Sequence, residues 1–509
     1  MSSLKPSATT SKSTMTETSP WVQFAQPWQP HAGQKKGVKF FLEHACTAMF
    51  ADPGCGKTSM VYAAFKILKK KGVANKMLVV APLRPAYLVW PAEQKKWLDF
   101  KDLRVEVLHG PKKAEALARD ADVYVINYEG LDWLLGATKS KTASGKTQVT
   151  VGLKRFKALG FDTLVLDELS KVKNPQSNRH KSLKQVIGTF GRRWGLTGSP
   201  AARSLMDLFG QVYILDMGRT FGPYITHFRT KYFVPAFNGF DWNLRKGAEK
   251  EIYERLKPLV CRLDAEDYID MPELVSNKIL FDLPPDIQEI YDRLEEDMIV
   301  RLGDEVVVAA NAASAAIKVR QVVNGGIYLD PDIKKLLAQT QFGKKAKRDW
   351  TNLHTLKVDL LEDLVDELQG SPLLVAYDFQ HDLDRLRSRF GQDVPYIGGG
   401  VSAKRAAKLE RAWNKGEIPL LLGHPQSIGH GLNLQEAGNH VCWHSMTYDF
   451  ELYDQFIRRV RRQGNRQQRV FVHHILARKT VDEVIYWMLQ AKDRTQRGLL
   501  DAMKNVRRK

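Results

Sequence analysis

Cysteine is scarce in this chain of 509 residues. The four cysteines, Cys46, Cys55, Cys261 and Cys442, are scattered along the sequence and lack the paired spacing of a metal site. This distribution argues against a disulfide framework or a zinc module. It indicates free thiols in a reducing compartment.

Long apolar runs and targeting signals are also missing. No stretch of about 18 apolar residues occurs, so the sequence predicts no membrane span. The first residues do not show the charged and then apolar pattern of a signal peptide. Residues 1–20 are rich in Ser and Thr and poor in large apolar side chains, which predicts a disordered tail.

Acidic residues are fewer than basic ones. The chain has 57 Asp and Glu against 77 Lys and Arg, a formal net charge of +20. A basic excess of this size is typical of proteins with a polyanionic partner. The segment Gln455–Lys509 holds 15 Lys and Arg against 4 Asp and Glu, more than half of the excess. The sequence therefore predicts a localised footprint for DNA or RNA.

A glycine-rich turn near the start of the chain has the pattern of a P-loop. Residues 51–58 read ADPGCGKT, and the residues after them have helical spacing. Gly54 and Gly56 let backbone N–H groups point at phosphates, Lys57 reaches the β- and γ-phosphates, and the Thr58 hydroxyl binds Mg²⁺. A helix that begins here also favours an anion at its N-terminus. The alternative is a glycine-rich turn without a ligand.

Two adjacent acids strengthen the P-loop hypothesis. In DTLVLDELSKVKN, residues 162–174, an apolar run ends at Asp167 and Glu168. A short apolar run suits a buried parallel strand, and ligands of open α/β sheets bind at the C-terminal ends of such strands. We expect Asp167 to hold Mg²⁺ and Glu168 to polarise the attacking water. The alternative is a strand end with two chance acids.

Strand-like and helical stretches alternate in two separate parts of the chain. This pattern predicts an α/β fold with two tandem RecA-like, doubly wound parallel-sheet lobes and a mixed helical insertion between them. The predicted units are a first lobe at 21–216, a linker with the insertion at 217–275, and a second lobe with a basic C-terminal segment at 276–509. The second lobe carries no P-loop of its own.

Four arginines are crowded into QFIRRVRRQG, residues 455–464: Arg458, Arg459, Arg461 and Arg462. One interpretation is a solvated basic face or a patch for nucleic-acid phosphate. The other is that some of them reach a nucleotide bound to the first lobe, where arginine stabilises charge on the γ-phosphate. The sequence alone permits both interpretations.

The order of these motifs resembles that of the Swi/Snf-type DNA-dependent ATPases of helicase superfamily two, from about residue 34 to residue 489. The resemblance implies that Gln34 reads adenine, that DPGCGKT and DELS are motifs I and II, and that SIGHGLNLQEAG, with Gly431, is motif V. The motif VI pattern falls on Gln455, Arg459 and Arg462, which assigns both arginines to the nucleotide. Two departures stand out: Ser170 replaces a histidine that is frequent in the family, and motif VI ends in Gly-Asn instead of Gly-Gln.

The resemblance also implies a nucleic-acid strand that crosses both lobes opposite the ATP side. Arg84, Asn127, His424, Ser427 and the loop 429–431 are the candidate contacts, each with the alternative of being a loop residue without a ligand. The lysine-rich stretches 138–147 and 344–348 either touch phosphate or are solvated loops. Phosphate-directed binding should be independent of sequence and strongly dependent on salt.

Together these features predict an ATP-dependent DNA translocase or remodelling motor that uses ATP and Mg²⁺. The expected partner is double-stranded or branched DNA without sequence preference; single-stranded DNA and an unidentified recruiting protein remain open. The alternatives are a strand-separating DNA or RNA helicase and a non-catalytic DNA-binding scaffold. No chromatin-reading module is recognisable, which favours the cytoplasm of a bacterial or phage-infected cell over a nucleus.

Overall fold

The computed structural model describes residues 25–52, 54–141, 147–198, 200–201, 204–235, 242–268, 271–303, 308–338, 349–429 and 431–504. The predicted tail 1–20 and the lysine-rich stretch 344–348 lie outside the described residues. Within the described part of the chain, none of the helices has the length and apolar character that a bilayer crossing requires.

The first lobe is built on a seven-stranded sheet in the order β11-β1-β8-β7-β2-β4-β3, in which every paired strand is parallel. Its strands are β1 (Cys46–Ala51), β2 (Met77–Ala81), β3 (Val105–Val107), β4 (Val123–Asn127), β7 (Thr163–Asp167), β8 (Arg192–Thr197) and β11 (Val260–Leu263). Its helices include α1 (Ala32–Glu43), α2 (Lys57–Lys70), α3 (Trp90–Lys96), α4 (Lys113–Ala118), α5 (Leu131–Leu135), α6 (Leu153–Ala158), α7 (Asn178–Val186) and α8 (Asp207–Asp216). A small hairpin, β5 (Thr138–Lys141) with β6 (Thr147–Thr150), lies beside them.

Both faces of this sheet are covered by apolar side chains. Along β1, Ala48 and Phe50 join one buried cluster, whereas Met49 and Ala51 join another. Successive side chains of a strand point to opposite faces. The continuous apolar runs of the sequence therefore reflect strands that are buried on two sides.

The second lobe has a six-stranded sheet in the order β12-β19-β18-β15-β17-β16, again parallel throughout. Its strands are β12 (Glu273–Phe281), β15 (Leu373–Ala376), β16 (Tyr396–Ile397), β17 (Leu420–Gly423), β18 (His440–Trp443) and β19 (Arg469–Ala477). Its helices are α14 (Leu356–Glu367), α15 (Gln380–Phe390), α16 (Ala403–Asn414), α17 (Pro425–Ile428), α18 (Phe450–Ile457) and α19 (Val481–Lys504). The two parallel sheets confirm the predicted α/β class with two tandem lobes.

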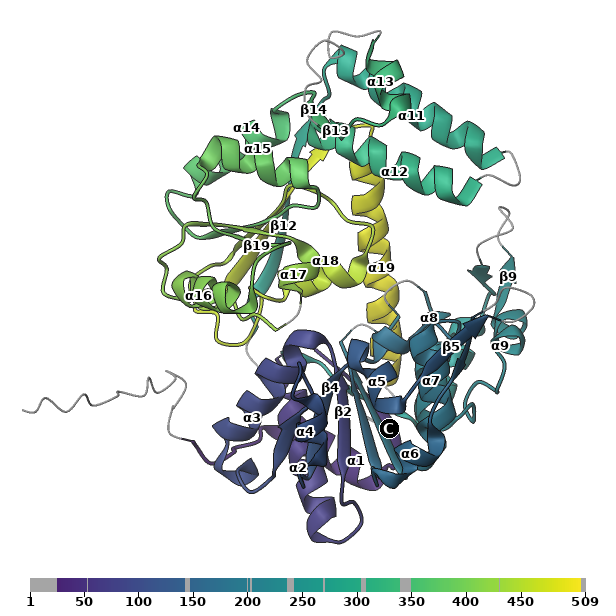
Figure 1. The fold of residues 1–509 in the computed structure, drawn as a ribbon. Coiled ribbons are helices and arrows are strands. Elements are labelled where there is room, and N and C mark those ends of the chain that lie inside the picture. Colours follow the sequence, from purple (N-terminus) through teal and green to yellow (C-terminus); the bar gives the residue numbers. More distant parts are fainter. Residues whose placement is uncertain are drawn as a thin grey trace, which may run out of the picture.

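Helical segments interrupt both lobes. Between β8 and β11 of the first sheet, after α8, the chain forms α9 (Ile225–Tyr232), the pair β9 (Phe233–Pro235) and β10 (Trp242–Leu244), and α10 (Ala248–Leu256). After β12 follow α11 (Pro285–Gly303), α12 (Val308–Asn324) and α13 (Pro331–Ala338), with the short pair β13 (Gly326–Tyr328) and β14 (Trp350–Asn352). These last elements project at the top of Figure 1.

The predicted linker 217–275 does not lie wholly between the sheets. Its strand β11 returns to the first sheet and pairs with β1, and β12 of the second sheet begins at Glu273. The limits 21–216, 217–275 and 276–509 remain a prediction. A boundary between the lobes has to fall after β11 and before β12.

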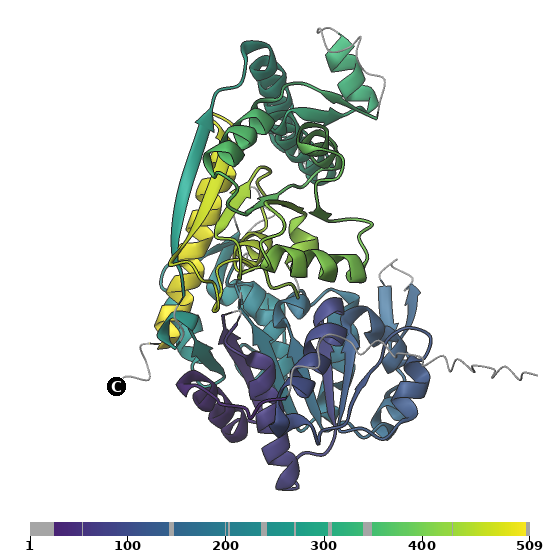
Figure 2. The ribbon, with the colours of Figure 1, turned by 90° about the vertical axis from the view of Figure 1, so that its left-hand side faces the viewer.

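The C-terminal helix α19 reaches across both lobes (Figures 1 and 2). It contacts α12, α18 and β19 in the second lobe, and α10 and β11 in the first. Ile485 and Leu489 of this helix are buried. The chain therefore ends on an element that both lobes share.

Candidate nucleotide site between the lobes

The glycine-rich turn lies where β1 ends and α2 begins. Gly54 and Gly56 have φ values of +96° and +74°, a region that L side chains rarely adopt. A Cβ at Gly56 would lie 2.2 Å from the side-chain nitrogen of Gln34. The backbone angle therefore favours glycine at position 56, and a larger side chain there would also displace Gln34. The glycines let the N–H groups of the turn face an anion.

Lys57 and Gln34 are held by this turn. The Lys57 ammonium donates hydrogen bonds to the carbonyl oxygens of Ala51 at 2.7 Å and Asp52 at 3.2 Å. Burial lowers the pKa of Lys57. The Gln34 amide donates to the carbonyl of Cys55 at 3.4 Å and accepts from the backbone of His31, which caps α1. Both side chains are thus placed at the P-loop before any ligand contributes.

The two acids lie at the C-terminal end of β7, as predicted for a strand of an open sheet. Asp167 accepts a hydrogen bond from the indole nitrogen of Trp90 at 2.9 Å, and burial raises the pKa of Asp167. Glu168 has left-handed backbone angles, φ 61° and ψ 67°, which are strained for a side chain of this kind. The Tyr128 hydroxyl lies 2.9 Å from the carbonyl oxygen of Asp167 and 3.2 Å from that of Glu168, so it can donate to either one and supports this turn.

Two hydroxyl groups fix the Glu168 carboxylate. Thr197 Oγ1, at the end of β8, donates to Glu168 Oε1 at 2.8 Å. Ser170 Oγ lies 3.0 Å from the same oxygen. The neighbouring strand and the turn after β7 therefore restrict the orientation of this side chain.

Two arginines approach from the second lobe, just after α18. A Cβ at Gly54 would lie 3.4 Å from Arg462 Nε, so Arg462 faces the P-loop. Its guanidinium also donates to the Asn433 side chain. Arg459 donates to the carbonyls of Gln455 at 3.0 Å and Leu432 at 3.2 Å. Burial lowers the pKa of Arg459, and the charge of Glu168 acts on it in the opposite direction.

The other two arginines of the cluster make different contacts with the first lobe and the segment that joins the lobes. Arg458 pairs with Asp454 of its own helix at 2.7 Å and with Asp52 of the P-loop at 2.9 Å. Burial by itself raises the pKa of Asp52, but Arg458, Arg262 and the Ala265 amide hold it at about 2. Arg461 donates to the carbonyl of Pro272 at 2.9 Å. These contacts are structural and are not those of a solvated basic face.

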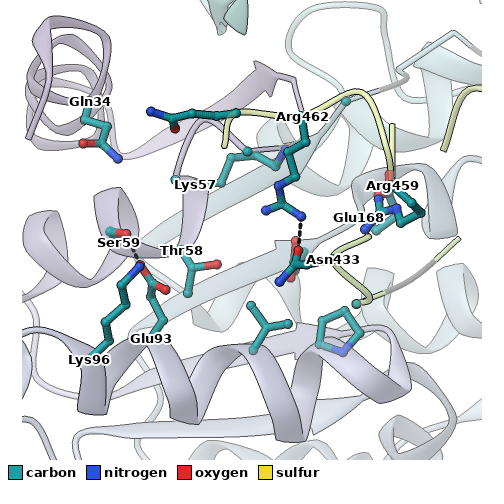
Figure 3. Close-up of a pocket in the computed structure, with 18 of the residues that line it drawn as sticks. Gln34, Lys57, Thr58, Ser59, Glu93, Lys96, Glu168, Asn433, Arg459 and Arg462 are labelled. Atoms are coloured by element: carbon teal, nitrogen blue, oxygen red, sulfur yellow. Dashed lines mark hydrogen bonds between the residues drawn. The ribbon is translucent and has the colours of Figure 1, made fainter. Parts of the chain in front are cut away.

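One cavity of about 600 Å³ joins these groups (Figure 3). The first lobe contributes Gln34, Gly54, Gly56, Lys57, Thr58, Asp167 and Glu168, and the second contributes Gly431, Asn433, Gln455, Arg459 and Arg462. Trp28, Lys96 and Trp97 also line this cavity. The structure thus brings every predicted catalytic, nucleotide-binding and metal-binding residue into a single space between the lobes.

The residues present fit a magnesium ion that is shared with phosphates. Among the described residues, no group of three or more His, Cys, Asp or Glu side chains is placed to hold a metal by itself. Mg²⁺ is commonly held by one or two protein oxygens together with water and substrate phosphate. The Thr58 hydroxyl and the buried Asp167 carboxylate, which face the same cavity, supply such oxygens.

The predicted nucleic-acid residues are only partly brought together. Arg84 donates to the carbonyl of Ser427 at 3.2 Å, a contact between the lobes, and the backbone N–H of Ser427 donates to the carbonyl of His424. The His424 ring itself lies 3.5 Å from Asp378. Asn127 ends β4 and its side-chain amide donates to Glu129, which is not one of the other candidates.

Several residues at the site had no predicted role. Trp90 is fully buried, and its indole N–H also binds Asp167. Tyr128, Thr197, Asn433 and Glu451 were not singled out. Tyr128 and Thr197 both follow or end parallel strands of the first sheet, so their position at the strand ends was a signal that could have identified them.

Comparisons with known proteins agree with this geometry. The SNF2-related domain matches residues 33–330, and the helicase conserved C-terminal domain matches residues 356–464. Protein p41 of Acyrthosiphon pisum secondary endosymbiont phage 1 is 32% identical over 492 residues, which are 93% of this chain and 98% of p41. YwqA of Bacillus subtilis (strain 168), named as an ATP-dependent helicase/translocase, is 24% identical over 473 residues.

The coverage of these relatives differs. The chain spans nearly all of p41, but the match covers only 47% of YwqA and 40% of the human DNA annealing helicase and endonuclease ZRANB3. A solved Sulfolobus solfataricus SWI2/SNF2 ATPase core in complex with dsDNA covers 94% of this chain at 19% identity, with a TM-score of 0.41. The SNF2-related match alone takes in more than half of the chain. The chain therefore belongs to the SNF2-related family and is an ATPase of the helicase superfamily two type.

Proposed function

We propose that the chain hydrolyses ATP between its two lobes when it binds DNA, and that it uses the hydrolysis to translocate along duplex DNA without reading its sequence. The observation that carries this proposal is the approach of Arg462, from the second lobe, to Gly54 of the P-loop in the first. A site assembled from both lobes can link the chemistry of a nucleotide to the angle between them.

The first lobe is proposed to bind the nucleotide. Gly54, Gly56 and the N-terminus of α2 offer N–H groups to the phosphates, and Lys57 adds a positive charge. Gln34, which lines the same cavity, is proposed to read the adenine edge. A Mg²⁺ ion held by Thr58 and Asp167 would neutralise charge on the phosphates.

Hydrolysis is proposed to depend on Glu168, Arg459 and Arg462. Glu168 orients or activates the attacking water, and its carboxylate is already fixed by Thr197 and Ser170. The two arginines stabilise negative charge that develops on the γ-phosphate, and such electrostatic stabilisation contributes strongly to the rate of phosphoryl transfer. The loss of either lobe from the site would therefore stop the reaction.

DNA is proposed to bind across the lobes beside Arg84, Asn127, His424 and Ser427. The Arg84–Ser427 contact joins the lobes, so a phosphate backbone that binds there is sensitive to their relative position. The net charge of +20 supports a polyanionic partner. The names of YwqA and ZRANB3 support action on nucleic acid, although both proteins are much longer than the matched part.

The test is the ATPase rate of the purified chain with duplex DNA, branched DNA, single-stranded DNA and RNA. We expect duplex or branched DNA to stimulate most. Lys57→Ala removes the positive charge that binds the phosphates, and Glu168→Gln removes the carboxylate that orients water, so each should lower kcat by about 10³-fold. Lys70→Ala, an exposed lysine at the end of the same helix α2, is the matched control and should leave the rate unchanged.

Two further results decide between the alternatives. Displacement of a third strand from a DNA triplex, without separation of a plain duplex, supports a translocase, whereas separation of the duplex supports a strand-separating helicase. Stimulation by RNA alone would overturn the assignment to DNA. Absence of hydrolysis with every nucleic acid would favour a binding scaffold.

A further inference from the structure

A serine hydroxyl joins two carboxyl groups from different lobes at the edge of the nucleotide cavity. Ser170 Oγ lies 3.0 Å from Glu168 Oε1 of the first lobe and 2.9 Å from Glu451 Oε1 of α18 in the second. Ser170 is 3% exposed and Glu451 is 9% exposed. The contact therefore lies in a region from which water is largely excluded.

The proton count at this bridge restricts the state of Glu451. A serine hydroxyl has one proton and cannot donate to both carboxylates at once. If Glu451 is a neutral carboxylic acid, it donates to Ser170 Oγ, and Ser170 donates to Glu168. If Glu451 is ionised, two negative carboxylates share one hydrogen-bond donor in a buried space, which is unfavourable.

The surroundings of Glu451 favour the neutral acid. Burial, and then the charge of Glu168, raise the pKa of Glu451 to about 7. The opposing influences are weaker. Lys173 Nζ lies 3.8 Å from Glu451 Oε2 and also pairs with Asp207, while the charge of Lys171 and the hydrogen bond with Ser170 also act to lower the pKa of Glu451. From its own helix, Gln455 donates to Glu451 Oε1 at 3.2 Å.

We propose that Glu451 is a positioning residue that acts through the Ser170 hydroxyl: when the second lobe docks, Glu451 orients Ser170, and Ser170 orients Glu168. With the second lobe docked, Glu451 polarises Ser170 and holds its proton toward Glu168, which completes the orientation of that carboxylate. When the lobes separate, this hydrogen-bond chain is broken. This inference rests on the proposed role of Glu168 in hydrolysis.

The position of Ser170 in motif II explains why a second side chain is needed to connect the lobes. Ser170 occupies the place of a histidine that is frequent in motif II of the family, and a hydroxyl is too short to reach far across the lobe interface. The longer Glu451 side chain spans the remaining distance from α18. Coupling in this chain therefore depends on a carboxyl outside the Gln455, Arg459 and Arg462 pattern.

Three variants test the bridge against the control Glu367→Ala, an exposed residue at the end of α14 in the same lobe. We expect Glu451→Ala and Ser170→Ala each to lower DNA-stimulated kcat by about tenfold, with little change in KM for ATP, because a hydrogen bond to a charged group is lost. The double variant should be no slower than the worse single variant, because both substitutions break one chain of hydrogen bonds. Additive losses would overturn the proposal.

The pH profile separates positioning from simple packing. A pKa raised from 4.5 to about 7 means that docking takes up a proton, so docking should weaken as pH rises from about 4.5 through 7. In wild type we expect kcat to fall between pH 6 and 8. Glu451→Gln keeps an uncharged donor to Ser170, so it should retain kcat near pH 6 and should not show this fall. A profile of Glu451→Gln that follows wild type would contradict the proposal.

A failure of the proposed function is distinguishable from a failure of this inference. If wild type shows no ATPase activity, the same four proteins of the cycle still report the Ser170–Glu451 coupling through thermal unfolding at pH 6. We expect non-additive changes in Tm. Additive changes there would overturn the bridge whatever the ATPase result.

Discussion

The two lobes present opposite chemistry to the cavity that they share. The first offers glycine-rich backbone and two acids, Asp167 and Glu168, at the C-terminal ends of parallel strands. The second has the same kind of parallel sheet, yet it offers arginines from the end of α18 and has no P-loop. The first lobe is thus suited to hold phosphate and metal, and the second to add positive charge.

This difference means that neither lobe contains a complete site. The lobes are joined at the cavity by polar contacts: Asp52 with Arg458, Ser170 with Glu451, and Arg84 with Ser427. Polar contacts gain less from association than an apolar interface of similar area, because their groups lose hydration. Such an interface can open and close at moderate cost, which the proposed translocation requires.

The sharpest test of the comparison lies within the arginine cluster. Arg462→Ala should lower kcat by about 10³-fold while DNA binding is retained, because an arginine on the γ-phosphate is worth that much in related chemistry. Arg461→Ala should lower it by less than about tenfold, since Arg461 donates to the Pro272 carbonyl instead. Equal losses in both, measured as steady-state ATPase rates, would remove the distinction between them.

A second test concerns the ion pair between Arg458 and the P-loop residue Asp52. Arg458→Ala leaves a largely buried carboxylate without this partner, so we expect roughly 3 kcal/mol less stability in urea unfolding. Arg469→Ala breaks a pair with Glu273 in which both side chains are more than 60% exposed, and should cost no more than about 1 kcal/mol. Similar losses of stability in both variants would show that the Arg458–Asp52 pair contributes no more than an exposed ion pair.

The pKa of Asp52 sets the pH range of that pair. Because the pKa is lowered from 3.8 to about 2, the pair stabilises the protein fully above pH 4 and loses its effect as pH falls toward 2. The difference in stability between wild type and Arg458→Ala should therefore be constant from pH 5 to 8. A difference that changes over this range would point to another titrating group.

A third and smaller effect is expected at the proposed DNA side. Arg84→Ala should weaken binding to duplexes of any sequence by about tenfold and reduce the slope of log K against log salt by about 1, because one phosphate contact is lost. Arg104→Ala, which removes an exposed arginine paired with Asp120, is the control. A sequence-dependent loss, or an unchanged salt slope, would argue against a phosphate contact.

The smallest expected effect is at Trp90. Trp90→Phe preserves most of the packing and removes only the N–H that binds Asp167, so kcat should fall by a few-fold, equivalent to about 1 kcal/mol. Trp413→Phe removes an indole hydrogen bond to Leu434 in the second lobe and should not change the Mg²⁺ concentration needed for half-maximal activity. If Trp90→Phe also leaves this Mg²⁺ concentration unchanged, Trp90 acts through packing alone.

The fold was predictable to the extent that its strands are buried on two faces. The run 164–166 and the inner strands β15 and β17 of the second lobe are continuous apolar segments, which sequence patterns reveal well. The edge strands were harder to predict: β12 carries Ser276, Asn277 and Lys278, and β11 is four residues long. An edge strand exposes one side to solvent, so its sequence need not look apolar.

The site shows a similar division. Motifs with fixed local spacing, such as the P-loop and DELS, identified residues whose neighbours in sequence are also neighbours in space. The pair Ser170 and Glu451 is separated by 281 positions, and nothing in either local sequence indicates the other. Contacts that depend on how two lobes dock are set by tertiary geometry, and a single sequence does not contain that geometry in readable form.

The helix α19 has a mechanical consequence for the two lobes. The covalent crossing near Pro272 and the packing of α19 on β11 and α10 attach the lobes at two separate places. In Figure 2, β12 and α19 run side by side along one side of the molecule. Two attachments on one side leave rotation about the line through them as the least restricted relative motion. With 24 residues, α19 is about 36 Å long, and we expect the lobes to swing apart about the side of the molecule on which it lies.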